Sequence, residues 1–222
     1  MLYPLLIAHL LGDFALQPDW MIRIKKQWGT WGVLPHIGII TLLTFLAVLP
    51  ALSLWWPYCV IIVLSHLLID IGKVTIDDRV KSRSLSLFLF LTDQALHCGM
   101  IVWMVVLAQK AGLQPIWNLT RQQWDEVYLL VLVAFVVGIL LRVFAPGYGW
   151  PNRWPATFAR AGTLLLVAEG IFWLSPIPVL LALKYHQLRG QTLTRAVWVE
   201  SLGGAIVATL CGLLFWMLYS TQ

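Results

Sequence analysis

Long apolar runs alternate with short polar or charged breaks along the whole chain. Several runs approach the roughly 20 residues that a helix needs to cross a bilayer, and their Leu, Ile and Val residues lack the alternation of a membrane barrel strand. This pattern predicts an all-α, polytopic transmembrane helical bundle of about six to seven membrane segments, folded as a single domain over residues 1–222. The expected segments cover about residues 1–16, 33–56, 57–73, 85–108, 127–144, 156–174 and 196–219.

Two of these segments are irregular. The first is short and ends at Pro18, so we expect it to enter only part of the bilayer or to begin at the interface. The sixth is interrupted at Ser175-Pro176-Ile177-Pro178, because proline removes a helical hydrogen-bond donor and clashes with the preceding turn. We therefore predict a helix break near Ser175–Pro178, after which residues 178–189 turn back as a re-entrant hairpin.

Composition places the chain among membrane proteins. Hydrophobic residues make up 60% of it, charged residues only 11%, and the mean hydropathy is +0.82, whereas a soluble domain has about a quarter charged residues. The net charge of +5 does not indicate nucleic acid, because the cations lie at the ends of apolar runs, where they meet lipid headgroups. We expect membrane lipid, and no nucleic acid, as the partner of this chain.

The basic residues also predict an orientation. With the N-terminus outside, ten of the 15 Lys and Arg residues fall in the loops after the first, third and fifth segments. Because cytoplasmic loops carry the excess of basic residues, we predict a multi-pass protein of the bacterial inner membrane with a periplasmic N-terminus. The ten residues are Arg23, Lys25, Lys26, Lys73, Arg79, Lys81, Arg83, Arg142, Arg153 and Arg160.

Three pairs of His and Asp residues interrupt the apolar runs at the same spacing. His9 precedes Asp13, His66 precedes Asp70, and Asp93 precedes His97, each by four residues. In a helix, residues four apart project from one face. An ionised side chain at mid-bilayer costs at least about 2.5–3.5 kcal/mol, so such groups face the protein interior and find partners there. The three pairs therefore predict one polar site between the first, third and fourth segments.

The residue types in this site suit a metal ion. Neutral imidazole and carboxylate both bind divalent transition metals, with zinc the leading candidate and manganese or iron as alternatives. The ion would offset the desolvation of the carboxylates and lower the pKa of a bound water to about 7. We therefore expect a membrane-embedded, metal-dependent hydrolase of a lipid or lipid-linked phosphate at the cytoplasmic interface. The expected ligands are His9, Asp13, His66, Asp70, Asp93 and His97, with Asp13, Asp70 and Asp93 as catalytic candidates, one of them free as general base.

Two other functions are compatible with the same residues. A small transporter or channel uses intramembrane Asp and His to bind a cation or to relay protons. A structural membrane subunit would use the pairs only as hydrogen bonds between helices. A closed pocket would favour the enzyme, whereas polar groups lining a path to both membrane surfaces would favour the transporter.

Several neighbouring residues complete the predicted site. Gln17, Lys73 and Gln94 are the candidates for substrate binding, although Lys73 is also a counter-ion candidate, and we favour an interface lysine whose amine reaches the headgroups. His36 is a candidate fourth imidazole that we interpret as an interface residue, and His186 is left out of the site.

Small residues in the later segments permit close helix packing. Gly138, Gly203, Gly204 and Gly212 lie in apolar runs where they allow helices to approach. A homo-oligomer is one use of these glycines, and packing inside the chain is the other.

The motifs around the His and Asp pairs resemble a known family. They are His9-Leu10-Leu11-Gly12-Asp13-Phe14, Leu16-Gln17-Pro18-Asp19-Trp20-Met21, His66-Leu67-Leu68-Ile69-Asp70 with Lys73, and Thr92-Asp93-Gln94 with His97. In this order they are similar to the bacterial membrane family catalogued as domain of unknown function 3307. Phe158-Ala159-Arg160 resembles that family's Leu-Glu-Arg motif without its Glu, while Leu181-Ala182-Leu183-Lys184 with Arg189, and Glu200-Ser201-Leu202-Gly203, are similar to its C-terminal pattern. The resemblance implies a polytopic inner-membrane protein and supplies no substrate.

Overall fold

A computed structural model describes the chain except residues 78–79, 81, 145–152 and 221–222. The described residues form helices joined by turns, which confirms the all-α prediction. They divide into two compact units, Met1–Asn118 and Leu119–Gln222. The expectation of a single domain over residues 1–222 stays a prediction, and each unit is described by itself.

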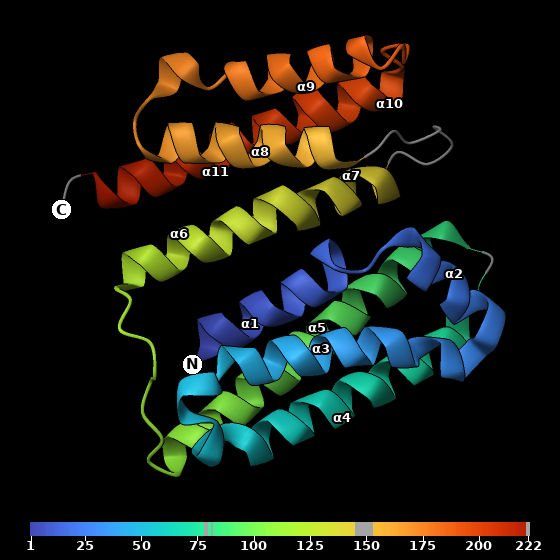
Figure 1. Cartoon of the computed structure of the whole chain (residues 1–222), viewed down its shortest axis with the longest axis vertical. Helices are drawn as coiled ribbons and strands as arrows, with labels where there is room; N and C mark the ends of the chain where they lie inside the picture. Colours follow the sequence, from blue (N-terminus) through green and yellow to red (C-terminus); the bar gives the residue numbers. More distant parts are fainter. Residues whose placement is uncertain (78–79, 81, 145–152, 221–222) are drawn as a thin grey trace. The chain divides into compact units, whose positions relative to one another are not determined.

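The first unit is a closed arrangement of four helices. Helix α1 packs against α3 and α5, and α4 packs against the same two helices; Figure 1 shows the four running side by side, with α2 at one end. The elements are α1 (Leu2–Leu10) with a π-helical turn (Leu11–Ala15), α2 (Asp19–Trp28), a 3-10 turn (Gly29–Val33), α3 (Leu34–Ala47), a 3-10 turn (Leu49–Ala51), α4 (Leu52–Asp77) and α5 (Arg83–Lys110).

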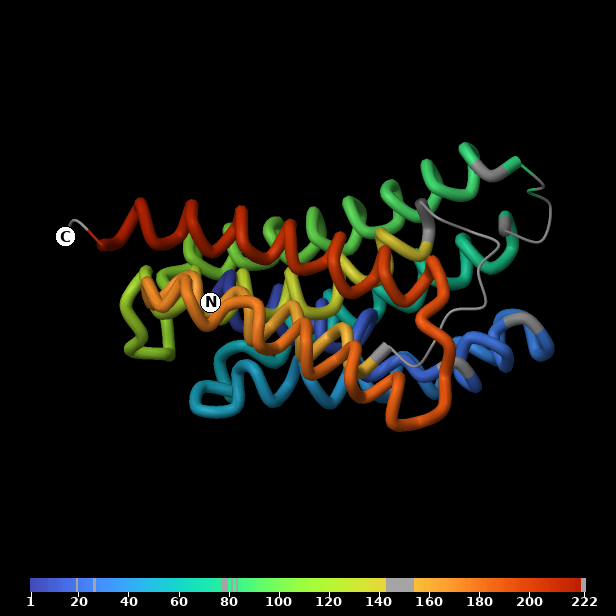
Figure 2. Tube along the Cα trace, turned by 90° about the horizontal axis from the view of Figure 1, so that it is seen from above, coloured from blue at the N-terminus to red at the C-terminus, as the bar shows by residue number. Residues whose placement is uncertain are grey.

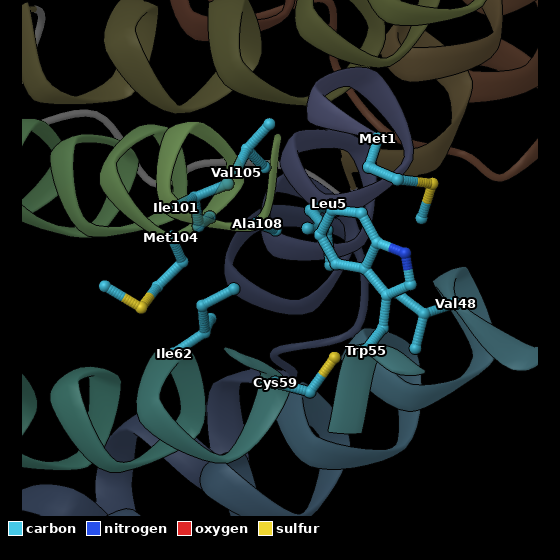
Figure 3. Close-up of a cluster of buried hydrophobic side chains, with 10 residues drawn as sticks. All are labelled: Met1, Leu5, Val48, Trp55, Cys59, Ile62, Ile101, Met104, Val105 and Ala108. Carbon is cyan, nitrogen blue, oxygen red and sulfur yellow. The ribbon is translucent and has the colours of Figure 1, made fainter. Parts of the chain in front are cut away.

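An apolar core fills one end of this first unit. Figure 3 shows its side chains converging from the start of α1, the start of α4 and the end of α5. Its centre holds Trp55, which is only 1% exposed. The chain turns at Pro50 and α4 begins at Leu52, so Trp55 lies inside α4 and not at the end of the expected segment 33–56. The core residues are Met1, Leu5, Val48, Trp55, Cys59, Ile62, Ile101, Met104, Val105 and Ala108.

Five helical stretches in the described part of the chain are long and apolar enough to span a membrane. They indicate a multi-pass membrane protein, as the hydrophobic runs predicted. The shorter apolar helix Leu2–Ala15 precedes them, and its length agrees with the expected short first segment. The five stretches are Gly29–Ala47, Leu49–Ile76, Ser84–Lys110, Arg121–Arg142 and Arg195–Tyr219.

The second unit is built around α8. Helix α11 packs along α8, and α9 packs along it as well; Figure 2 shows α11 as a long continuous helix in red. Residues 145–151 are rich in proline and glycine, which predicts a turn, and they lie outside the described residues. The elements are α6 (Arg121–Val131), a π-helical turn (Leu132–Val136), α7 (Val137–Phe144), α8 (Arg153–Ala168), a 3-10 turn (Phe172–Leu174), α9 (Ile177–Leu188), α10 (Arg195–Trp198), a second π-helical turn (Val199–Gly203) and α11 (Gly204–Tyr219).

The predicted break in the sixth segment is present and begins earlier than expected. Helix α8 ends at Ala168, where Gly170 adopts φ +75° and the N–H of Ile171 donates to the carbonyl of Leu166 at 2.7 Å. A glycine in this conformation ends a helix at little steric cost. The chain then turns at Ser175, and α9 packs back on α8. With 16 and 12 residues, α8 and α9 are each shorter than the roughly 20 residues of a full span.

Arg160 corrects the sequence-based orientation count. Its side chain is 1% exposed, and its Nε and Nη2 donate to the carbonyl of Ala134 at 3.1 and 2.8 Å. It is therefore an interior residue of the second unit and no loop cation. The periplasmic N-terminus stays a prediction. Five other residues of that count have side chains that the structure does not describe. They are Lys26, Arg79, Lys81, Arg83 and Arg153.

Glycines let α8 approach its neighbours. A Cβ on Gly212 of α11 would lie 2.8 Å from Cβ of Val167 and 3.1 Å from the carbonyl oxygen of Leu164. A Cβ on Gly138 or Gly204 would meet the Arg160 side chain. These three glycines thus serve packing inside the second unit, and the possible homo-oligomer stays a prediction.

We expect Gly212→Ala to destabilise the protein by about 1–3 kcal/mol, the usual cost of an overpacked contact. The added methyl group would press on the backbone of α8 as well as on Val167, so a side-chain rotation alone cannot relieve it. Gly203→Ala is the matched control, because its Cβ would lie 3.8 Å from Leu141, an ordinary contact. Unfolding of both variants in detergent by circular dichroism measures the difference, and equal stabilities would contradict the packing described.

Candidate metal centre

The His and Asp residues gather at the end of the first unit opposite the apolar core. Because consecutive helices run in opposite directions, the end of α1, the start of α3, the later half of α4 and the earlier half of α5 meet at one level. The apolar segments of the same helices occupy the other level. The centre consists of His9 and Asp13 from α1 and its π-helical turn, His36 from α3, His66 and Asp70 from α4, and Asp93 and His97 from α5.

Asp13 is surrounded by imidazoles. Its Oδ1 lies 3.1 Å from Nε2 of His36, 3.4 Å from Nε2 of His66 and 3.8 Å from Nδ1 of His9. Its Oδ2 accepts a hydrogen bond from the Gln94 amide at 3.0 Å. Side chains from four different segments therefore converge on this one carboxylate.

Asp13 lies in a π-helical turn. The turn covers Leu11–Ala15, and the N–H of Leu16 donates to the carbonyl of Leu11 at 2.8 Å, five residues back. Such single turns interrupt α-helices mainly at functional sites. The wider turn shifts the direction of the side chains that follow it, which a sequence pattern of period 3.6 does not anticipate.

Asp70 is paired with a lysine from the preceding amphipathic helix. Nζ of Lys25 donates to Oδ2 of Asp70 at 2.8 Å. The same oxygen lies 3.7 Å from Nε2 of His36, while Oδ1 lies 3.8 Å from Nε2 of His97. The ammonium group offsets part of the cost of burying this carboxylate.

Asp93 has a lysine partner of its own. Nζ of Lys73 donates to Oδ2 of Asp93 at 2.8 Å, and the Gln94 amide approaches the same oxygen at 3.2 Å. Oδ1 of Asp93 lies 3.5 Å from Nε2 of His97. Lys73 is therefore a counter-ion of the centre, and the interface role that we favoured from the sequence is wrong.

The imidazole rings contact one another directly. The rings of His66 and His97 are stacked, with centroids 3.8 Å apart and planes inclined by 21°. His9 lies against both at 5.4 and 5.2 Å, and His36 lies 5.3 Å from His66. Four imidazoles thus share one small volume, where a positive charge on every ring would be strongly unfavourable.

Several polar atoms of the centre are buried without a hydrogen-bond partner. All four histidines, Asp70 and Asp93 are at most 5% exposed. Both ring nitrogens of His9 and of His97, Nδ1 of His36, and an Oδ1 on each of Asp13 and Asp93 have no hydrogen bond. Buried polar atoms are nearly always satisfied, and these atoms belong to groups that could hold a metal ion.

The described side chains form three groups with the donor atoms for a metal ion. In each group the ligand atoms lie within 4.8 Å of one another. His66 belongs to two of the groups, and Asp70 also belongs to two. The groups are His9, Asp13 and His66; His36, His66 and Asp70; and Asp70, Asp93 and His97.

The structure brings together all six residues that we expected from their spacing. It differs from the sequence in how they pair, since His66 lies against Asp13 of α1 while Asp70 lies against His36 and His97. Cross-helix contacts therefore replace the pairing within α4 that the four-residue spacing indicated.

Sequence reasoning missed two members of the centre. His36 is 1% exposed and contacts Asp13, although we interpreted it as an interface residue. Lys25 was counted only as a topology signal. A usable signal for Lys25 was its place one helical turn after Met21, which is buried. No comparable signal marked His36.

The remaining candidates occupy different positions. With its amide oriented to satisfy both neighbours, Gln17 donates to the backbone carbonyl of Asp13 at 3.1 Å and accepts from Nζ of Lys25 at 3.0 Å. The Gln94 amide donates a hydrogen bond to a carboxylate oxygen of Asp13 and to one of Asp93. His186 lies in the second unit, where its Nδ1 is 2.7 Å from Oε1 of Gln191. Gln17 and Gln94 thus contact members of the centre, and their role in binding a substrate stays a prediction.

Comparison with known proteins places the first unit in a family. The model of the family described as "Protein of unknown function (DUF3307)" matches residues 1–141, a range that includes every member of the centre. No curated protein and no solved structure matches the chain.

We expect Lys73→Met to destabilise the metal-free protein by about 1–3 kcal/mol, because removing one partner leaves a buried charge partly unpaired. Lys110→Met at the exposed end of α5 is the control. Detergent-solubilised protein would be unfolded with denaturant and followed by tryptophan fluorescence. Equal denaturation midpoints for the two variants would contradict a stabilising ion pair between Lys73 and Asp93.

Proposed function

The chain belongs to the DUF3307 family, and we propose that it is a membrane-embedded, metal-dependent enzyme that hydrolyses a lipid or lipid-linked phosphate. One observation carries the proposal: four imidazoles and three carboxylates meet in a buried centre whose ring nitrogens include several without a hydrogen bond. A divalent transition metal suits this mixture of nitrogen and oxygen donors. Zinc is our first choice, with manganese or iron as alternatives.

The ion would supply the nucleophile, because it lowers the pKa of a bound water to about 7. Residues of the chain would bind the ion and accept the proton of the bound water. Of Asp13, Asp70 and Asp93, the carboxylate left free by the ion would act as general base. Lys25 and Lys73 place positive charge beside two of these acids, Asp70 and Asp93.

Lys73 is our candidate for contact with the substrate phosphate. Its side chain is 26% exposed, compared with 16% for Lys25 and 6% for Asp70. It is therefore the charged group of the centre that a ligand at the surface can reach most easily. Because it already pairs with Asp93, it can hold a phosphate oxygen beside the acidic group.

The position of the centre favours a substrate at the membrane surface. Helix α2 carries exposed aromatic and basic side chains, among them Trp20, Arg23 and Trp28, a composition typical of the headgroup region. Lys25 of the same helix contacts Asp70. A lipid headgroup at the level of α2 would thus lie next to the centre, on the side that we predict to be cytoplasmic.

The apolar core argues against a transporter. A relay or ion path needs polar groups that reach both membrane surfaces, but the described side chains between α1, α4 and α5 beyond the centre are Leu5, Ile62, Ile101 and their apolar neighbours. A purely structural subunit is disfavoured for another reason. Hydrogen bonds that serve only packing would satisfy the buried nitrogens of His9 and His97.

We expect protein purified without chelator to contain a divalent transition metal and to release phosphate from lipid phosphates in mixed micelles, with loss of activity in EDTA. Asp70→Asn should lower metal affinity by more than the roughly 10–100-fold typical of residues that only support a ligand. Mass spectrometry of the metal content and a phosphate-release assay measure both effects.

His186→Asn is the matched control, because it changes a buried histidine of the second unit and should leave metal content and turnover unchanged. Wild-type protein without any transition metal would refute the proposal. Normal metal content in Asp70→Asn would remove Asp70 from the ligands.

A further inference from the structure

Asp70 presents its two oxygens to two different sets of ligands. Its Oδ2 faces Nε2 of His36 at 3.7 Å, and its Oδ1 faces Nε2 of His97 at 3.8 Å. It is also the carboxylate that belongs both to the group with His36 and His66 and to the group with Asp93 and His97. A carboxylate placed in this way can bridge two ions.

The stacked histidines argue against a single ion. An imidazole nitrogen binds a metal in the plane of its ring, so two nearly parallel rings stacked face to face do not point at one ion. The ring centroids of His66 and His97 lie 3.8 Å apart with planes inclined by 21°, so each ring directs its nitrogens to a position of its own. Their Nε2 atoms also face different carboxylates, Asp13 for His66 and Asp93 for His97.

The number of donors agrees with two ions. A zinc ion takes about four ligands, including water in a catalytic site, whereas seven side chains surround this centre. His9, Asp13 and His66 form one set of ligand atoms within 4.8 Å of one another, and Asp70, Asp93 and His97 form another. Among the described side chains, Lys25 and Lys73 pair with Asp70 and Asp93, while Asp13 faces imidazoles and the Gln94 amide. An ion beside Asp13 would supply positive charge to that carboxylate.

Charge then points to the substrate class. Three carboxylates and two lysines give the centre a formal charge of −1 with neutral imidazoles. One divalent ion would bring it to +1, and two would bring it to +3. A centre of charge +3, built beside a membrane surface, favours an anionic ligand such as a phosphate, whose oxygens a pair of ions can clamp.

We propose that the centre binds two divalent transition-metal ions bridged by Asp70, with a phosphate oxygen as their shared ligand. This inference rests on the proposed function and deepens it. Around the first ion lie His9, Asp13, His36 and His66, and around the second lie Asp93 and His97.

Metal stoichiometry tests the two-ion centre without any assay of turnover. Wild-type protein equilibrated with Mn²⁺ and freed of unbound ion should retain two ions per chain, and its electron paramagnetic resonance spectrum should show exchange coupling between them. Asp93→Asn combined with His97→Asn should retain one ion and give the six-line signal of an isolated Mn²⁺. His186→Asn should retain two coupled ions.

Three outcomes are distinguishable. Two coupled ions in the wild type, reduced to one in the double variant, support the inference. One ion with an uncoupled signal in the wild type overturns it and leaves the proposed function standing as a mononuclear enzyme. No bound Mn²⁺ overturns the two-ion centre, and it overturns the proposed function as well when protein purified without chelator contains no transition metal. Because the spectrum of the wild type decides by itself, a variant that fails to fold does not weaken the test.

Inorganic phosphate tests the anionic ligand separately. Added to the Mn²⁺-loaded wild type, it should alter the exchange-coupled signal at millimolar concentration, while sulfate at the same ionic strength should have a smaller effect. An unchanged spectrum would remove the shared phosphate ligand and keep the two ions.

Discussion

The cost of burying carboxylates among apolar helices governs the first unit. Asp13, Asp70 and Asp93 lie where water is scarce, and an ionised acid in such a place needs a partner. Lys25 and Lys73 are the partners of Asp70 and Asp93, each with its Nζ 2.8 Å from a carboxylate oxygen. Among the described side chains, the partners of the third acid, Asp13, are imidazoles and an amide. Lysines thus compensate Asp70 and Asp93, and Asp13 is the acid beside which we propose a metal ion.

The same requirement divides the unit into two levels. Polar groups collect where α2 supplies Lys25, and Trp55 and its apolar neighbours fill the opposite end. Packing of large apolar side chains holds the helices in register, and that register brings residues of α1, α3, α4 and α5 to one level. One end of the first unit is thus polar and the other apolar.

In the second unit, the partners of two arginine side chains include an acid and a backbone carbonyl. Nη2 of Arg142 donates to Oε1 of Glu200 at 2.9 Å, and Arg160 donates to the carbonyl of Ala134. Ala134 and Glu200 both lie in π-helical turns, as Asp13 does. A π-helical turn changes the local hydrogen-bond pattern, and in this unit an arginine donates to a carbonyl of one such turn. Arg142 is paired with Glu200, and Nη1 of Arg160 lies 3.9 Å from the same carboxylate without a hydrogen bond of its own.

The sequence by itself determined the membrane class, the helical fold, the break near Ser175–Pro178 and the six residues His9, Asp13, His66, Asp70, Asp93 and His97. These follow from local properties: hydropathy, the cost of intramembrane charge, proline and a four-residue spacing. Only the tertiary structure decided that His36 and Lys25 join the centre, that Lys73 pairs with Asp93, and that Arg160 is buried. The reason is that a partner on another helix depends on rotation, register and π-helical turns, which arise from packing along the whole helix. The local sequence can therefore mark a candidate residue but does not give its partner.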